Sequence, residues 1–226
     1  MPKSTTGEWT RRQFVAGVAA AGVAGRVVWG AGSSAPATMT GDAALRELMA
    51  GNERFAAGKI TSFAEDLEIL KAKTVSKQEP FAAVLSCADS RVPVEIVFDE
   101  SIGKIFVGRV AGNIVTPEIM ASMEYGVAVL GVRAILVLGH TNCGAISAAV
   151  GGKEVPGQIS VLYQHLMPGV RDAHGDVAAA VKANVIFQTR LLGESSTVIA
   201  KAVKDQGVKV AGGVYDLGTG RVTIVA

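Results

Sequence analysis

The two cysteines of this 226-residue chain each lie beside other residues that can take part in metal chemistry. Cys87 stands in the stretch "LSCADSRVP", where Asp89 and Arg91 follow it at alternate positions. Cys143 comes three residues after His140 in "GHTNCGA". Two thiolates and one imidazole form a donor set that suits tetrahedral Zn²⁺ and leaves its fourth coordination position open. The pattern therefore predicts one zinc ion per chain, held by Cys87, His140 and Cys143.

Asp89 has two alternative roles at such a site. As a fourth ligand it would close a structural Cys₂HisAsp site, whereas beside three ligands it would orient a water molecule on the metal. A bidentate ion pair with Arg91 would keep the Asp89 carboxylate ionised and away from the metal, which favours the orienting role. The residues alone also allow a disulfide between the cysteines, a structural pair of thiols, or a surface ion pair of Asp89 with Arg91.

The elements that carry these residues must bring the two clusters together. Both clusters end short apolar runs, residues 81–87 and 133–140, which are typical of strands buried on both faces. The alternation of such strands with helical patterns predicts an α/β fold with a mostly parallel central sheet flanked by helices. Because ligands gather beyond the carboxyl ends of parallel strands, we expect both clusters at one edge of the sheet.

The remaining elements follow from periodicity and from end signals. We expect a first helix over residues 41–59, with Asp42 as its N-cap, and a second helix over residues 63–77. Pro117 should begin a helix, because proline suits the first helical position. Residues 42–226 are expected to form a single domain. The other expected elements are a strand at 104–110, helices at 143–150, 177–195 and 197–206, and a strand, turn and strand within 208–226.

Charge separates the first 37 residues from the rest. Residues 1–37 hold four basic residues and one acidic residue, so the remaining chain has 18 basic and 19 acidic groups. That balance argues against binding to a nucleic-acid backbone. Arg11 and Arg12 precede an apolar run of about 12 residues, which is too short to cross a membrane core of ~30 Å.

The segment 1–37 resembles a twin-arginine export signal, with "APA" at residues 35–37 as its cleavage site. It predicts a protein of the periplasm or another extracytoplasmic compartment, without a stable membrane span after signal cleavage. An amphipathic or membrane-anchoring helix is the alternative interpretation of these residues.

The motifs together resemble those of the β-class carbonic anhydrases. "SCADSRVPVE" and "GHTNCGA" are similar to that family's Cys-x-Asp-x-Arg and Gly-His-x-x-Cys-Gly segments, and "FVGRVAGN" and "SMEYGVAVLGV" match the stretch between them. The resemblance implies reversible hydration of CO₂ to bicarbonate and a proton, by attack of a zinc-bound hydroxide that Asp89 and Arg91 orient. A CS₂ or COS hydrolase on the same scaffold, or a non-catalytic protein with a closed zinc site, is the alternative.

The resemblance also implies a homodimer or higher homo-oligomer, with active-site clefts at the subunit interface and N-terminal helices that reach onto the partner. Gln78 matches a glutamine that hydrogen-bonds bicarbonate, and Phe106 and Tyr125 match aromatics that line the CO₂ pocket. A loop amide and ordinary core packing are the alternatives for these residues. Val84 stands where some members have an aromatic that helps move the aspartate onto the metal, so we expect that state to be less favoured here.

Overall fold

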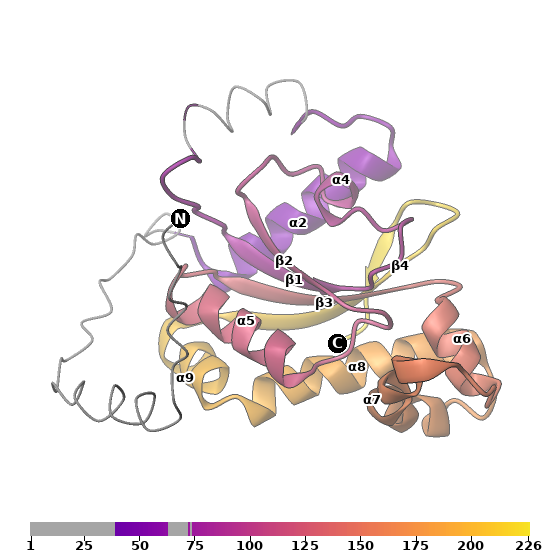
Figure 1. Ribbon diagram of the computed structural model, residues 1–226. Helices are drawn as coiled ribbons and strands as arrows, with labels where there is room; N and C mark the ends of the chain where they lie inside the picture. The colour runs from indigo at the N-terminus through magenta and orange to yellow at the C-terminus, as the bar shows by residue number, and fades with distance from the viewer. Residues whose placement is uncertain (1–38, 63–71, 73) are drawn as a thin grey trace, which may run out of the picture. The chain divides into compact units, whose positions relative to one another are not determined.

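The computed structural model describes residues 39–62, 72 and 74–226, which belong to one compact unit (Figure 1). The predicted export signal at 1–37 lies outside the described residues. Residues 63–71 and 73 of the predicted second helix lie outside them as well. Among the helices of the described part of the chain, none has the length and apolar character needed to cross a bilayer.

A five-stranded sheet in the order β2-β1-β3-β4-β5 forms the centre of the unit. Strand β1 (Ala82–Ser86) pairs in parallel with β2 (Ile105–Arg109) and with β3 (Ala134–His140). Strand β4 (Lys209–Tyr215) continues the parallel pairing beside β3, and the short β5 (Val222–Ile224) closes the sheet antiparallel to β4. The prediction of a mostly parallel sheet is confirmed.

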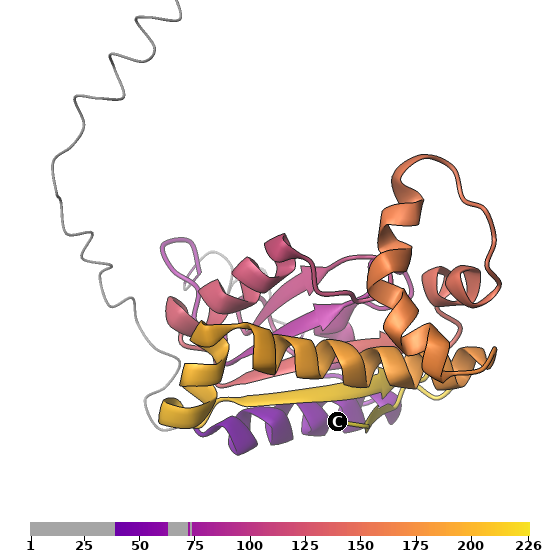
Figure 2. The same cartoon turned by 90° about the horizontal axis from the view of Figure 1, so that it is seen from below.

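Helices cover both faces of this sheet, as Figures 1 and 2 show. One face carries α2 (Gly41–Ala56) and the short α4 (Val94–Val97). The other carries α5 (Pro117–Ala128), α8 (Val177–Ser195) and α9 (Thr197–Gln206). The predicted α/β architecture is therefore confirmed, and α2 packs its buried residues on the sheet of its own chain.

The apolar run of β1 shows why its residues are buried on both sides. Ala82 and Val84 belong to the core under α2 and α4, whereas Ala83 and Leu85 belong to the core under α5, α8 and α9. Successive strand side chains point to opposite faces, so a strand covered on both faces needs an apolar residue at every position. A strand of this kind brings its following residue, Cys87, to the edge of the sheet without exposing it.

A third core lies beyond the carboxyl ends of the strands, under α6 (Gly144–Val150) and α7 (Ser160–Asp172). A single 3₁₀ turn, η2 (Gly157–Ile159), leads into α7. This core includes Cys87 and Cys143. The sequence patterns did not predict α7, which contains Pro168, or the four-residue α4.

Three predicted helix ends are wrong. Thr40, not Asp42, caps α2, because Thr40 is extended and its hydroxyl accepts a hydrogen bond from Ala43 N at 3.2 Å. Asp42 lies in the first turn, where a negative charge suits the helix dipole. The helix ends at Ala56 rather than Lys59, since Gly58 has a left-handed φ of 66°. Residues 74–76 form bends, so the prediction of a helix up to residue 77 is wrong for these residues.

Candidate metal centre and active site

Cys87, His140 and Cys143 lie together at the carboxyl edge of the sheet. Cys87 directly follows β1, His140 is the last residue of β3, and Cys143 is the N-cap of α6. The ligand atoms of these three buried residues all lie within 4.8 Å of one another. The parallel pairing of β1 with β3 therefore brings the predicted zinc ligands to one place.

The two sulfurs are spaced for a shared metal ion rather than for a disulfide. Both cysteines are free and buried, and their Sγ atoms are 4.0 Å apart. A disulfide requires about 2.05 Å between sulfurs, whereas a tetrahedral zinc with bonds of about 2.3 Å separates them by about 3.8 Å. The structure therefore has the spacing of a zinc site and not that of the disulfide alternative.

His140 presents one ring nitrogen to this group. Its Nδ1 lies 2.9 Å from the carbonyl oxygen of Thr141, so Nδ1–H donates to that oxygen and Nε2 keeps its lone pair. Nε2 is buried and has no hydrogen-bond partner among the residues that the structure describes. Because a buried polar atom without a partner is costly, this nitrogen fits a metal ion at the centre of the group. The donor set and its geometry thus suit zinc.

The protein stabilises negative charge on one of the two thiols. The hydrogen bond from Cys143, together with one from the backbone N–H of Gly112 at 3.3 Å, lowers the pKa of Cys87 although burial opposes it. The same sulfur–sulfur contact and burial raise the pKa of Cys143. A divalent cation would favour the thiolate form of both residues.

Asp89 and Arg91 form the bidentate pair that the sequence suggested. Arg91 Nε donates to Asp89 Oδ1 at 2.9 Å and Nη2 donates to Oδ2 at 2.8 Å, while Arg91 N donates to Oδ1 at 2.9 Å. These bonds hold the pKa of the Asp89 carboxyl well below its usual range. Oδ2 lies 3.7 Å from Nε2 of His140, so the ionised carboxylate borders the metal group.

Arg109 is a residue of the site that the sequence reasoning missed. It is the last residue of β2, and its guanidinium crosses to the loop after β1. Nε donates to the carbonyl oxygen of Cys87 at 2.9 Å, and Nη2 donates to that of Asp89 at 2.6 Å. Arg109 therefore holds the backbone that carries both a metal ligand and the acid. Its only sequence signal was its place in the family segment "FVGRVAGN".

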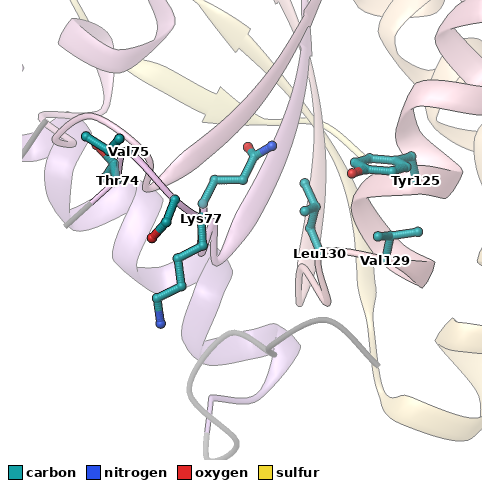
Figure 3. Close-up of a pocket in the computed structure, with 8 residues that line it drawn as sticks. Thr74, Val75, Lys77, Tyr125, Val129 and Leu130 are labelled. Atoms are coloured by element: carbon teal, nitrogen blue, oxygen red, sulfur yellow. The ribbon is translucent and has the colours of Figure 1, made fainter. Parts of the chain in front are cut away.

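The predicted substrate residues lie apart from the metal group of their own chain. Gln78 and the half-exposed Tyr125 line a surface pocket of about 560 Å³, whose walls come from the 74–78 segment and the end of α5 (Figure 3). The Phe106 ring packs 6.2 Å from that of Tyr125. Phe106 is in register with Ala83, which precedes Cys87 by four residues, or roughly 13 Å of strand. Their role in substrate binding stays a prediction.

Comparison with known proteins places these residues in a family. A family model described as carbonic anhydrase matches residues 82–222, more than half of the chain. Carbonic anhydrase 2 of Mycobacterium tuberculosis is 33% identical over 190 residues, which cover 80% of this chain and 91% of that protein. The carbonic anhydrase of Mycolicibacterium smegmatis is 35% identical over 190 residues, 80% of this chain and 92% of that protein.

Solved structures agree with the sequence relatives. One of two tetrameric β-carbonic anhydrases from Sordaria macrospora has a TM-score of 0.67 at 25% identity, over 80% of this chain and 96% of that one. The Coccomyxa β-carbonic anhydrase in complex with acetazolamide has a TM-score of 0.61 at 28% identity, over 80% and 86% of the two chains. The chain belongs to the β-carbonic anhydrase family.

In this β-carbonic anhydrase the candidate zinc-binding group is Cys87, His140 and Cys143. The predictions that the chain is an enzyme of the carbonic anhydrase type and that its cofactor is zinc are confirmed. The similarity to the family is not confined to the motifs, because the regions matched by these relatives include about 80% of the chain.

Proposed function

We propose that this β-carbonic anhydrase catalyses the reversible hydration of CO₂ to bicarbonate and a proton at the Cys87, His140 and Cys143 group. The observation that carries the proposal is the geometry of the donor set. Three buried ligand atoms converge, and an ionised carboxylate held by an arginine stands beside them. A site of three protein ligands keeps a position for water or substrate, which is the arrangement of catalytic zinc.

Zinc held there supplies the Lewis acidity that makes water an effective nucleophile near pH ~7. The protein's own groups do the orienting. Asp89 is ionised and can only accept hydrogen bonds, so it accepts one from the attacking water and aims an oxygen lone pair at the carbon of CO₂. Arg91 donates to both carboxylate oxygens, and this bidentate pair would keep Asp89 from turning onto the metal as a fourth ligand.

The remaining contacts of the site keep this arrangement rigid. Arg109 holds the carbonyls of Cys87 and Asp89, and Arg91 Nη2 also donates to the carbonyl of Asn142 at 3.2 Å. That last bond connects the loop after β1 with the loop between His140 and Cys143. The two halves of the site are therefore joined by protein contacts, and a zinc ion held by Cys87, His140 and Cys143 would join them further.

We further propose that the enzyme works as a homodimer or larger homo-oligomer. Gln78, Phe106 and Tyr125 lie beside a pocket away from the metal group of their own chain. A cleft shared between subunits would bring this pocket to the metal group of a partner, as the family resemblance implies. The similar Sordaria macrospora enzymes are described as tetrameric, which supports an assembled state. Sedimentation equilibrium of the zinc-loaded enzyme would show a monomer mass if the proposal is wrong.

The activity is tested by stopped-flow CO₂ hydration with zinc analysis on the same samples. We expect about one zinc per chain in the wild type. Cys143→Ala should lose most of its zinc and its activity, because one of three ligands is gone. Ser122→Ala, which removes an exposed hydroxyl on α5, is the control and should keep both. Assays with COS and CS₂ test the alternative substrates, and a zinc-loaded wild type inactive on CO₂ at any pH would refute the proposal.

We also propose that residues 1–37 direct export from the cytoplasm. Arg11 and Arg12 stand directly before the apolar run, and a pathway that exports folded proteins would carry a metal site loaded in the cytoplasm. Changing both arginines to lysine should leave the enzyme in the cytoplasmic fraction. Unchanged fractionation of this double variant would contradict the proposal.

A further inference from the structure

The loop between β2 and α5 contacts the metal group at the Cys87 sulfur. The Gly112 backbone N–H in this loop donates to the Cys87 sulfur at 3.3 Å, and the contact is buried. Gly112 and Asn113 both have left-handed backbone angles, with φ of 78° and 44°. A Cβ on Gly112 would come within 2.9 Å of Leu166 Cδ2, so the loop packs closely against α7 at this glycine. The position of the Gly112 N–H thus depends on two consecutive residues with left-handed backbone angles.

Two buried polar side chains of α8 hold this loop. Asn184 Nδ2 donates to the carbonyl oxygen of Gly112 at 3.0 Å, and Gln188 Oε1 accepts from Val115 N at 2.8 Å. Gln188 Nε2 in turn donates to Asn184 Oδ1 at 3.1 Å. Asn184 is 1% exposed and Gln188 is fully buried, so water does not compete for these bonds.

Helix α7 keeps the two α8 residues in place. Gln188 Nε2 also donates to the carbonyl oxygen of His165 on α7 at 3.0 Å. Gly169 of α7 lies so close to α8 that a Cβ there would be 2.7 Å from Asn184 N. The chain of contacts therefore runs from α7 through Asn184 and Gln188 to the loop, and from the loop to the Cys87 sulfur.

We propose that Asn184 and Gln188 are positioning residues of the metal centre, which hold the Gly112 N–H against the Cys87 thiolate. A hydrogen bond to a metal-bound thiolate delocalises its charge and fixes the direction of its lone pairs. Removing an outer contact of this kind commonly lowers metal affinity or activity by about 10- to 100-fold. This inference rests on one part of the proposed function, namely that Cys87 is a zinc ligand.

Asn184→Leu tests the assignment, because leucine has the same branched shape as asparagine, though a larger volume, and cannot donate to the carbonyl of Gly112. Thr189→Val is the matched control: it removes a buried polar group of the same helix, whose hydroxyl donates within α8 to the carbonyl of Val185. We expect Asn184→Leu to release zinc to a competing chelator roughly 10-fold or more faster than the wild type. Thr189→Val should release it within about 2-fold of the wild-type rate.

A spectroscopic signal separates positioning from a general loss of stability. In the cobalt-substituted enzyme the thiolate-to-cobalt charge-transfer band should move to longer wavelength in Asn184→Leu, because a thiolate without its N–H partner gives up an electron more easily. The band should stay in place in Thr189→Val. Equal release rates and equal bands in the two variants would overturn the proposal, even if both proteins are less stable.

A measurement on the wild type keeps the proposal testable if Asn184→Leu does not fold. In the ¹¹³Cd-substituted enzyme the amide proton of Gly112 should show scalar coupling to the metal through the N–H···S bond. An uncoupled Gly112 amide would overturn the proposal without any variant. Neither this coupling nor the release rates depend on CO₂ turnover, so a wild type that failed the hydration assay would refute the proposed function and leave this inference standing.

Discussion

Asp89 receives three hydrogen bonds from a single residue, and this contact supports the orienting role proposed for its carboxylate. Arg91 contacts both carboxylate oxygens with its side chain and one of them with its backbone N–H. The ion pair is partly exposed, so its value to stability is small. The pair fixes the direction of the carboxylate, whose Oδ2 lies 3.7 Å from His140 Nε2, and we propose that this oxygen accepts a hydrogen bond from water.

The Asp89→Asn variant tests that role. An amide keeps the shape of the carboxylate but loses the charge, and its nitrogen cannot accept a hydrogen bond. We expect CO₂ hydration to fall about 10²- to 10⁴-fold, as for other positioned proton acceptors, while zinc content stays near one per chain. Stopped-flow rates and metal analysis of the same preparations measure both quantities.

Asp205→Asn is the control for this variant, since it removes the charge of an exposed i,i+4 pair with Lys201 on α9. It should leave hydration and zinc content unchanged. A wild-type rate for Asp89→Asn would show that the carboxylate orients nothing, and loss of zinc from this variant would indicate that Asp89 is a fourth ligand.

At the scale of elements, close packing of helices on the sheet places the loops that carry the site. Helix α2 approaches the end of α4 so closely at Gly51 that a Cβ would lie 1.7 Å from the carbonyl oxygen of Phe98. Asn52 beside it donates to the carbonyl oxygens of Val97 and Gly220 and accepts from Val222 N. These contacts join α2, α4 and the turn before β5 in one layer.

The variants Gly51→Ala and Gly193→Ala should change stability in opposite directions. Alanine at Gly51 meets a backbone atom that cannot rotate away, so we expect the free energy of unfolding to fall by about 1–3 kcal/mol. At Gly193 of α8 a Cβ meets nothing within 4 Å, and alanine should add about 0.5–1 kcal/mol through helix propensity. Urea unfolding of the zinc-loaded proteins measures both changes, and a gain for Gly51→Ala would contradict the packing described.

At the scale of the whole molecule, folding buries the carboxyl group of Glu100 and makes its ionisation less favourable. Glu100 follows α4, is 8% exposed, and its Oε1 has no hydrogen-bond partner within the described part of the chain. Burial, with the nearby carboxylate of Glu47, raises the pKa of Glu100 to about 7, against the favourable charges of Arg54 and Lys104. Its folded-state pKa thus lies above its unfolded value near 4.5.

The sign of the effect on stability follows from these two values. The folded state binds the Glu100 proton more tightly than the unfolded state does. The stability that this proton contributes is therefore fully present below about pH 4.5 and is lost as the pH rises through about 7. Glu100→Gln carries no such proton. The free energy of unfolding of this variant relative to the wild type should therefore rise between pH 4.5 and 8, by up to about 3 kcal/mol.

Urea unfolding of both proteins at several pH values and at one protein concentration measures this difference. Glu194→Gln, which changes an exposed carboxylate of α8, is the control and should run parallel to the wild type. Parallel curves for Glu100→Gln would show that the buried carboxyl is ionised in the folded protein at no cost.

The sequence by itself predicts the candidate metal ligands and the strands that carry them. Continuous apolar runs identify β1 and β3 because a strand covered on both faces needs an apolar residue at every position. Cys87 and His140 follow from these runs as the residues at the strand ends. The helix at Pro117 and the limits of α8 and α9 were also predicted from local signals of proline position and apolar periodicity.

Only the tertiary structure decided which distant residues support the site. Arg109, Asn184 and Gln188 reach the metal group through contacts with residues 20 to 73 positions away. A polar residue on a helix is usually a solvated one, and no local pattern distinguishes Asn184, which is buried against a loop. The separation of Gln78 and Tyr125 from the metal likewise depends on how β2 and α5 pack, because spacing along the chain carries no information about distances across a sheet.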